Sequence, residues 1–194
     1  MLQKLSELFS AKRAPAGYRP GVTLEHLRRN LGMARFEQME PTAARAYVED
    51  GSLQLEIVER TESQLLMHLV MTEFVIRVPA LQEGAASFEL HHSGAVRRTG
   101  IRCRQRAGDA ALLAALQARL QEDKALHQAL MPLDFKRLRI DREGRQWCVR
   151  LEHMGGSEVV NRMPAFRRYI ALSREQRNWL FEALTGLQRV LRTL

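Results

Sequence analysis

Apolar and polar residues alternate along much of the first half of the chain, and this period of two restricts the fold more than any other feature. From Leu53 to Ile57 and from Phe74 to Val78, every second residue is apolar. Because successive side chains of a strand point to opposite faces, this spacing predicts strands between about residues 33 and 106. The segment Leu65–Met71 is apolar at almost every position, which predicts a strand buried on both faces. Short connections favour antiparallel neighbours, with Pro79 ending one strand.

The same spacing returns in the second half of the chain. Phe135–Ile140 and Trp147–Leu151 predict two strands joined by a hairpin turn at Asp141–Gly144. The glycine pair Gly155–Gly156 is interpreted as a further turn, because glycine readily adopts positive φ. A last strand is expected near Arg167–Leu172.

Helical spacing flanks the predicted strands. Leu24, Leu27 and Leu31 recur on one helical face, with Thr23 as the predicted N-cap and Gly32 as the end. Three further helices are expected over about residues 110–121, 124–131 and 174–194, the last beginning with the S-x-x-Q capping box of Ser173 and Gln176.

Strands and helices are grouped rather than alternating one to one, which favours an α+β fold. We expect a curved antiparallel sheet packed by helices on one side and capped by a C-terminal helix. TATA-binding-protein-like and helix-grip folds have this shape, by analogy alone. Residues 1–22 are predicted to form a short amphipathic helix and a Pro/Gly linker. Residues 23–194 then form a single domain, or two half-units over about 23–121 and 123–194.

The net charge of +8 is unevenly distributed. Residues 1–94 contain 10 Lys and Arg against 12 Asp and Glu, whereas residues 95–194 contain 20 against 10. This asymmetry predicts a basic surface in the second half of the chain.

One face of the strand expected over residues 95–106 is rich in arginine. Four of its arginines occupy even positions, whereas Ile101 and Cys103 take the other face. Guanidinium groups about 6.6–7 Å apart could follow phosphates or bind a carboxylate ligand. The candidate ligand-binding residues are Arg98, Arg102, Arg104 and Arg106, together with Arg162, Arg167 and Arg168 near the last strand. Arg137, Arg139 and Arg150 extend the patch if the fold brings them close.

The arginine-rich strand also has a purely structural interpretation. It could be a solvated sheet face, or an edge strand whose charges discourage aggregation. Aromatic residues that could stack on bases are scarce nearby, and no RNA-binding sheet motif is present.

No set of residues predicts a catalytic or metal site. His91 and His92 are adjacent, so in a strand they point apart, and no H-x-x-x-H or C-x-x-C accompanies them. Cys103 lies between arginines that point away from its thiol. The glycine pair lacks the lysine of a Walker loop. We therefore expect no catalytic residue, no metal and no cofactor.

Cysteine usage and hydropathy predict a cytoplasmic location. Cys103 and Cys148 form no C-x-x-C, and no signal for secretion is visible at the N-terminus. The longest apolar run is too short to span a bilayer, so no membrane span is expected.

Three stretches resemble a family of bacterial proteins of unknown function: GYRPGVTLEHLRRNLG, LLMHLVMTEF and RRYIALS. The resemblance covers most of the chain after about residue 15. It implies a soluble, single-domain bacterial protein and carries no activity, substrate or site residue.

The sequence thus predicts a non-enzymatic binding module. Its partner is expected to be an anionic small ligand, such as a carboxylate or acyl compound, or an acidic protein surface. The alternative is a nucleic-acid-binding protein that uses the arginine-rich second half.

Overall fold

A computed structural model describes residues 18–33, 35–48, 51, 53–63, 67–94, 97–162 and 165–194. The short helix predicted within residues 1–22, and most of the linker after it, lie outside these ranges. Within them the chain combines helices with one antiparallel sheet, which confirms the predicted α+β class. The division of the chain into half-units stays a prediction.

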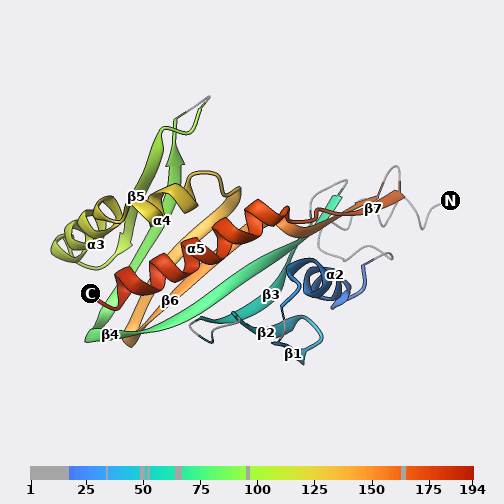
Figure 1. Cartoon of the computed structure of the whole chain (residues 1–194), viewed down its shortest axis with the longest axis horizontal. Coiled ribbons are helices and arrows are strands. Elements are labelled where there is room, and N and C mark those ends of the chain that lie inside the picture. Colours follow the sequence, from blue (N-terminus) through green and yellow to red (C-terminus); the bar gives the residue numbers. More distant parts are fainter. Residues whose placement is uncertain are drawn as a thin grey trace.

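Seven strands of the described residues form the sheet, in the order β1-β2-β3-β4-β6-β7, with β5 paired to β4 (Figure 1). All neighbouring pairs are antiparallel, as the short connections predicted. The strands are β1 (Arg35–Glu40), β2 (Ala43–Tyr47), β3 (Gln54–Ser63), β4 (Met67–Ser93), β5 (Gly100–Ala107), β6 (Phe135–Arg162) and β7 (Ala165–Tyr169).

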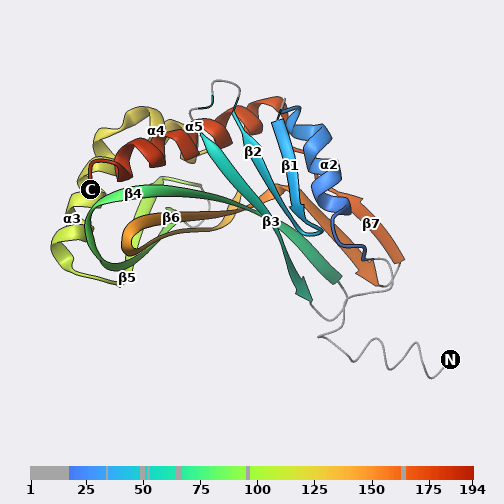
Figure 2. The ribbon, with the colours of Figure 1, turned by 90° about the horizontal axis from the view of Figure 1, so that it is seen from below.

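Strands β4 and β6 are unusually long, with 27 and 28 residues, and they curve back on themselves (Figure 2). Their register shifts between Pro79 and Gly84 of β4, opposite Gly144 of β6, whose φ is 58°. The residues on both sides of the bend in β4 pair with β6, and neither strand folds into a hairpin with its own second half. Both strands therefore continue through the bend. The predictions that Pro79 ends a strand and that Asp141–Gly144 forms a hairpin turn are therefore wrong. Pro79 borders this irregularity, and bulges are among the positions at which strands tolerate proline.

The glycine pair lies inside β6 and does not form the turn to the next strand. Register between β4 and β6 shifts there, since Val70 pairs with Glu158 but Thr72 pairs with His153. Gly156 has φ 88°, and its carbonyl accepts a hydrogen bond of 2.6 Å from the Thr72 hydroxyl. The glycines thus shape a bulge, as strands often use positive φ to re-aim the chain. The predicted turn is wrong in position, because β6 continues to Arg162.

The connection from β4 to β5 also comes later than expected. His91 and His92 belong to β4, which ends at Ser93. Strand β5 begins at Gly100, and Arg98 therefore precedes the strand.

Four helices of the described residues pack against one side of the sheet. They are α2 (Val22–Leu31), α3 (Ala110–Glu122), α4 (Lys124–Leu130) and α5 (Arg174–Leu191). Figure 2 shows α2, α4 and α5 on the same side, as predicted. The core between helices and sheet buries Trp147, Leu151 and four leucines of α5, namely Leu180, Leu184, Leu187 and Leu191. The Ser173–Gln176 capping box at the start of α5 is confirmed.

Helix α2 begins two residues earlier than predicted. Its N-cap is Gly21, which has φ 85°, and not Thr23. The Glu59 carboxylate of β3 accepts hydrogen bonds from the Gly21 and Leu24 amides, at 3.1 and 3.0 Å. A carboxylate is stabilised at a helix N-terminus by unpaired amides and the helix dipole. A distant strand residue therefore takes the role that the sequence assigned to Thr23, which is buried and donates to Glu158 instead.

Candidate anion-binding face

The register of β4, β5 and β6 brings arginines from two strands onto one face of the sheet. Glu89 of β4 lies opposite Arg104 of β5 and opposite Arg139 of β6. Directly opposite residues in antiparallel strands point to the same face and have neighbouring side chains. Arg104 and Arg139 therefore flank one carboxylate, although 34 intervening positions, most of them in α3, α4 and β6, separate them in sequence.

This face points away from the helical core. On the same strands Leu90 pairs with Cys103 and with Leu138, and all three pack in or against the core. Alternation then places the neighbouring arginines on the opposite side. We call this surface the basic face and define it by Arg102, Arg104, Arg106, Arg137 and Arg139. The first four are exposed and Arg139 is half-buried.

Positive charge on the basic face exceeds the negative charge beside it. Arg106 pairs with Glu89 at 3.3 Å, and Arg137 pairs with Glu152 at 3.1 Å. The other three arginines, Arg102, Arg104 and Arg139, form no ion pair with any residue that the structure describes. The face therefore offers three guanidinium groups to an external anion.

A polar cleft of about 400 Å³ opens beside Arg139. It arises because the two halves of β6 approach each other across the bend. Arg137 donates to Glu152, and Arg150 donates to Asp141 at 2.6 Å. Residues nine and fifteen positions apart in β6 could not touch in an extended strand, since each position adds about 3.3 Å. Charged side chains of the basic face consequently lie on the inside of the bend.

Most of the charges in this cleft are already neutralised. Arg60 pairs with the buried Glu73 at 2.9 Å, and Arg137 and Arg150 have the partners just given. Arg139 is the lining arginine that has no ion pair among the described residues. It therefore joins the cleft to the basic face and is the group best placed to bind an anion in it.

Arg98 does not belong to the basic face. Its guanidinium donates to the carbonyls of Met131 and Leu133, at 3.1 and 2.9 Å, and pairs with Asp134 at 2.9 Å. These acceptors lie in the connection from α4 to β6. Arg98 thus holds that connection against the start of β5.

The three other candidate arginines lie at the opposite end of the molecule. Figures 1 and 2 both place β5 and β7 at opposite ends of the long axis. Arg167 of β7 donates two hydrogen bonds to the buried Glu158, and Arg168 is exposed. Arg162 ends β6, and its backbone pairs with Ala165. The seven candidate residues therefore do not form one site, and Arg102, Arg104 and Arg106 are those that the structure groups with other arginines.

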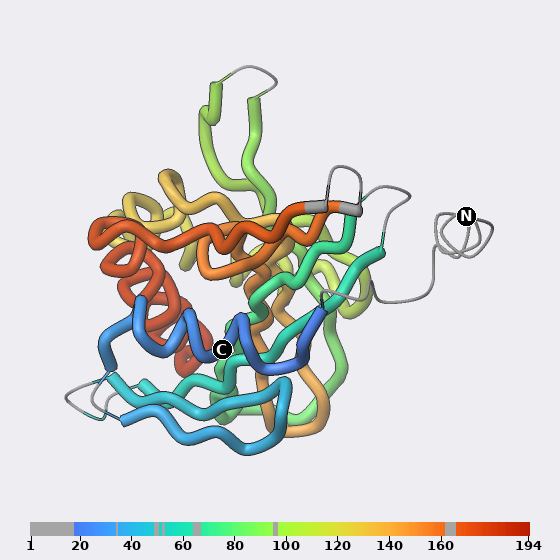
Figure 3. Tube along the Cα trace, turned by 90° about the vertical axis from the view of Figure 1, so that its right-hand side faces the viewer, coloured from blue at the N-terminus to red at the C-terminus, as the bar shows by residue number. Residues whose placement is uncertain are grey.

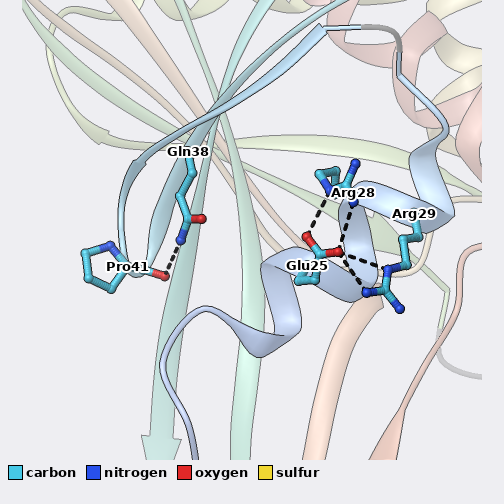
Figure 4. A network of polar contacts seen from close by, with 5 residues as sticks. All are labelled: Glu25, Arg28, Arg29, Gln38 and Pro41. Carbon is cyan, nitrogen blue, oxygen red and sulfur yellow. Dashed lines mark hydrogen bonds and ion pairs between the residues drawn. The ribbon is translucent and has the colours of Figure 1, made fainter.

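Some arginines elsewhere on the surface have internal partners. On α2, Glu25 accepts hydrogen bonds from Arg28 and Arg29 at 2.8–2.9 Å (Figure 4). The hydrogen bond from Arg28 lowers the pKa of Glu25 to about 2. Arg28 and Arg29 thus differ from Arg102, Arg104 and Arg139, which form no ion pair among the described residues.

Burial shifts the pKa of both thiols and of the most buried histidine toward the uncharged form. Burial raises the pKa of the Cys103 thiol to about 11 and also raises the pKa of Cys148. His153 is fully buried, and burial lowers its pKa. Within the described ranges, no three His, Cys, Asp or Glu side chains are grouped closely enough to hold a metal ion.

The sequence pattern indicates that Arg137 and Arg139 share a strand face, but it gives no indication of the position of Glu89. Arg137 and Arg139 alternate with Leu138 and Ile140, which marks them as sharing a face of one strand. Glu89 carries no comparable signal, since its role depends on lying between two other strands. The cleft depends on the bend in β6, which sequence spacing does not reveal.

None of the helices that the structure describes is long and apolar enough to cross a bilayer.

Comparisons with known proteins place the chain in a family. No curated protein and no solved structure matches the chain. A family model, however, matches residues 29–191, which include every residue of the basic face. The chain belongs to DUF3156, a family of proteins of unknown function.

Proposed function

We propose that this protein is a non-catalytic binding module whose basic face recognises a partner carrying carboxylate groups. The observation that carries the proposal is a group of three arginines on one face of the sheet, Arg102 and Arg104 on β5 and Arg139 on β6. Their guanidinium groups form no ion pair among the described residues, unlike those of Arg106 and Arg137. Arginine suits this role because its planar fork of donors matches a carboxylate.

The face already holds one carboxylate of its own. Glu89 lies between Arg104 and Arg139 and pairs with Arg106 at 3.3 Å. A ligand carboxylate placed beside Arg102 or Arg139 would find a similar environment. We favour carboxylates over nucleic acid because the exposed Phe166 lies on β7, at the far end from these arginines. Among the residues that the structure describes, bases would therefore have no exposed phenyl ring beside the basic face on which to stack.

Charge alone supports weak binding. An exposed ion pair contributes about 0.2–1 kcal/mol, so three arginines supply about 1–3 kcal/mol. A micromolar complex requires about 8 kcal/mol. A physiological partner must therefore gain further contacts, from the cleft or from the backbone beside the arginines.

Fluorescence anisotropy with labelled hexaglutamate tests the proposal. Replacing Arg104 and Arg139 by alanine is expected to weaken binding by about two- to thirty-fold, from two lost ion pairs. The matched control replaces Arg174 and Arg192, two exposed arginines of the α5 region without ion pairs among the described residues. Equal weakening by both double variants would overturn the proposal, because the effect would then follow net charge. Tighter binding of oligothymidylate, with affinity falling steeply as salt rises, would favour the nucleic-acid alternative.

We also propose a cytoplasmic location for this module. It is supported by Cys103 and Cys148, which are both free thiols.

A further inference from the structure

Strand β5 carries Arg102, Arg104 and Arg106, and one of its two edges pairs with no described strand. Among the described strands β5 pairs with β4 alone. The amide of Gln117 in α3 donates to the carbonyl of Cys103 at 3.3 Å, so this carbonyl points away from β4. The N–H and C=O of one strand residue point to the same side. The backbone groups of Cys103 and, two residues earlier, Ile101 therefore face the free edge.

A cavity of about 420 Å³ lies beside this edge. Ile101, Arg102 and Cys103 line it on the strand side, and Gln117, Leu120 and Leu130 line it on the side of α3 and α4. It combines apolar walls, one guanidinium and the edge backbone groups of β5, of which the Cys103 carbonyl accepts the hydrogen bond from the Gln117 side chain. These are the groups that an added strand uses, since its backbone pairs with the edge and alternate side chains enter pockets.

We infer that a partner protein binds by adding an extended acidic segment to the β5 edge as a further strand. Its apolar side chains would enter the cavity on the core side of the sheet. The side chains between them would lie beside Arg102, Arg104 and Arg106 and would carry carboxylates. The recognised sequence therefore alternates Asp or Glu with Leu, Ile or Val. This inference rests on the proposed function and names its partner.

Charge decides between an acidic partner and a second copy of this chain. Two β5 edges paired with each other would set two rows of arginines side by side, and like charges directly opposite are destabilising. The exposed arginines that discourage self-pairing complement an acidic strand. The end of the β4–β5 hairpin projects from the body of the molecule, which leaves room for a partner (Figure 3).

Selection from a display library of random peptides of about nine residues tests the inference. Enriched peptides should alternate acidic and apolar residues and lack central proline. Enrichment of sequences without this alternation, or no enrichment, would overturn strand addition.

Backbone methylation then separates strand addition from attraction by charge. Alternate amides of the best peptide are N-methylated in two sets, one facing β5 and one facing solvent. We expect one set to weaken binding about ten-fold or more and the other less than about two-fold, because only inward amides pair with the edge. Gln121→Trp, which fills the cavity from an exposed position, should also weaken binding.

The possible failures are distinguishable. If both methylated sets bind equally well, but replacing Arg104 and Arg139 by alanine abolishes binding, the basic face is supported and strand addition is overturned. If the enriched peptide binds wild type and the variant lacking Arg104 and Arg139 equally tightly, the proposed function is overturned, because the basic face then contributes nothing to binding. Preference for an oligonucleotide over every peptide would contradict both.

Discussion

Arg167 and Arg168 are neighbours on β7, yet we expect their replacement to have very different effects on stability. The Glu158 side chain that Arg167 binds is 1% exposed, and the Thr23 hydroxyl also donates to it. Removing one partner of a buried ion pair costs about 3–5 kcal/mol, because a buried charge is left without compensation. Since the Arg167 side chain is 29% exposed, water offsets part of this cost. We therefore expect Arg167→Ala to lower the free energy of unfolding by about 2–4 kcal/mol.

Urea denaturation followed by circular dichroism at pH 7 measures this difference. The control Arg168→Ala, an exposed substitution one residue away, should change stability by less than about 0.5 kcal/mol. Adding Glu158→Gln to the Arg167→Ala variant should restore part of the loss, because a buried amide costs less than a buried carboxylate. Equal stability of the two single variants would refute this reasoning. Arg167 would then be available to a ligand, as the sequence first suggested.

Two further predictions follow from groups whose pKa is shifted. Burial acts to raise the pKa of Glu158, but hydrogen bonds from Arg167 and Thr23 prevail and leave it lowered. A carboxyl with a lowered folded-state pKa stabilises the protein above its unfolded-state value and loses this contribution as pH falls through the folded-state value. Acid titration of unfolding free energy should therefore be steeper below about pH 4.5 in wild type than in Arg167→Ala, and parallel curves would contradict the assignment. The Cys103 pKa of about 11 predicts alkylation by iodoacetamide at pH 8 far slower than that of an unfolded-state cysteine. Mass spectrometry of timed samples measures the rate, and labelling as fast as in urea would be inconsistent with a buried thiol.

Local patterns predicted the elements well where burial alternates regularly along a strand or helix. The even-numbered arginines of β5 share a face because Ile101 and Cys103 pack against the core, a relation visible in the spacing alone. Arg98 has the same parity but lies before the strand begins, where alternation no longer applies. A pattern can assign a face only as far as the strand extends.

The spacing of residues along the sequence does not predict which distant segments pair in the fold. Thr23 has the side chain of an N-cap, but Glu59 of β3 takes that role because the sheet carries it to the helix N-terminus. Pro79 and Gly144 look like the ends of short strands and instead bend two long ones. In each case the deciding partner is distant in sequence. The same reason explains why Glu89 and the cleft beside Arg139 were not foreseen.

Nuclear magnetic resonance of the arginine side chains tests the central claim most directly. In a protein labelled with nitrogen-15, each Arg Nε–Hε group gives its own signal, and hexaglutamate is added stepwise. Our account predicts that the signals of Arg102, Arg104 and Arg139 shift together and saturably, while that of Arg167 stays in place because Glu158 already holds it. Shifts confined to β7, or spread evenly over all exposed arginines, would contradict the assignment of the anion site to the basic face.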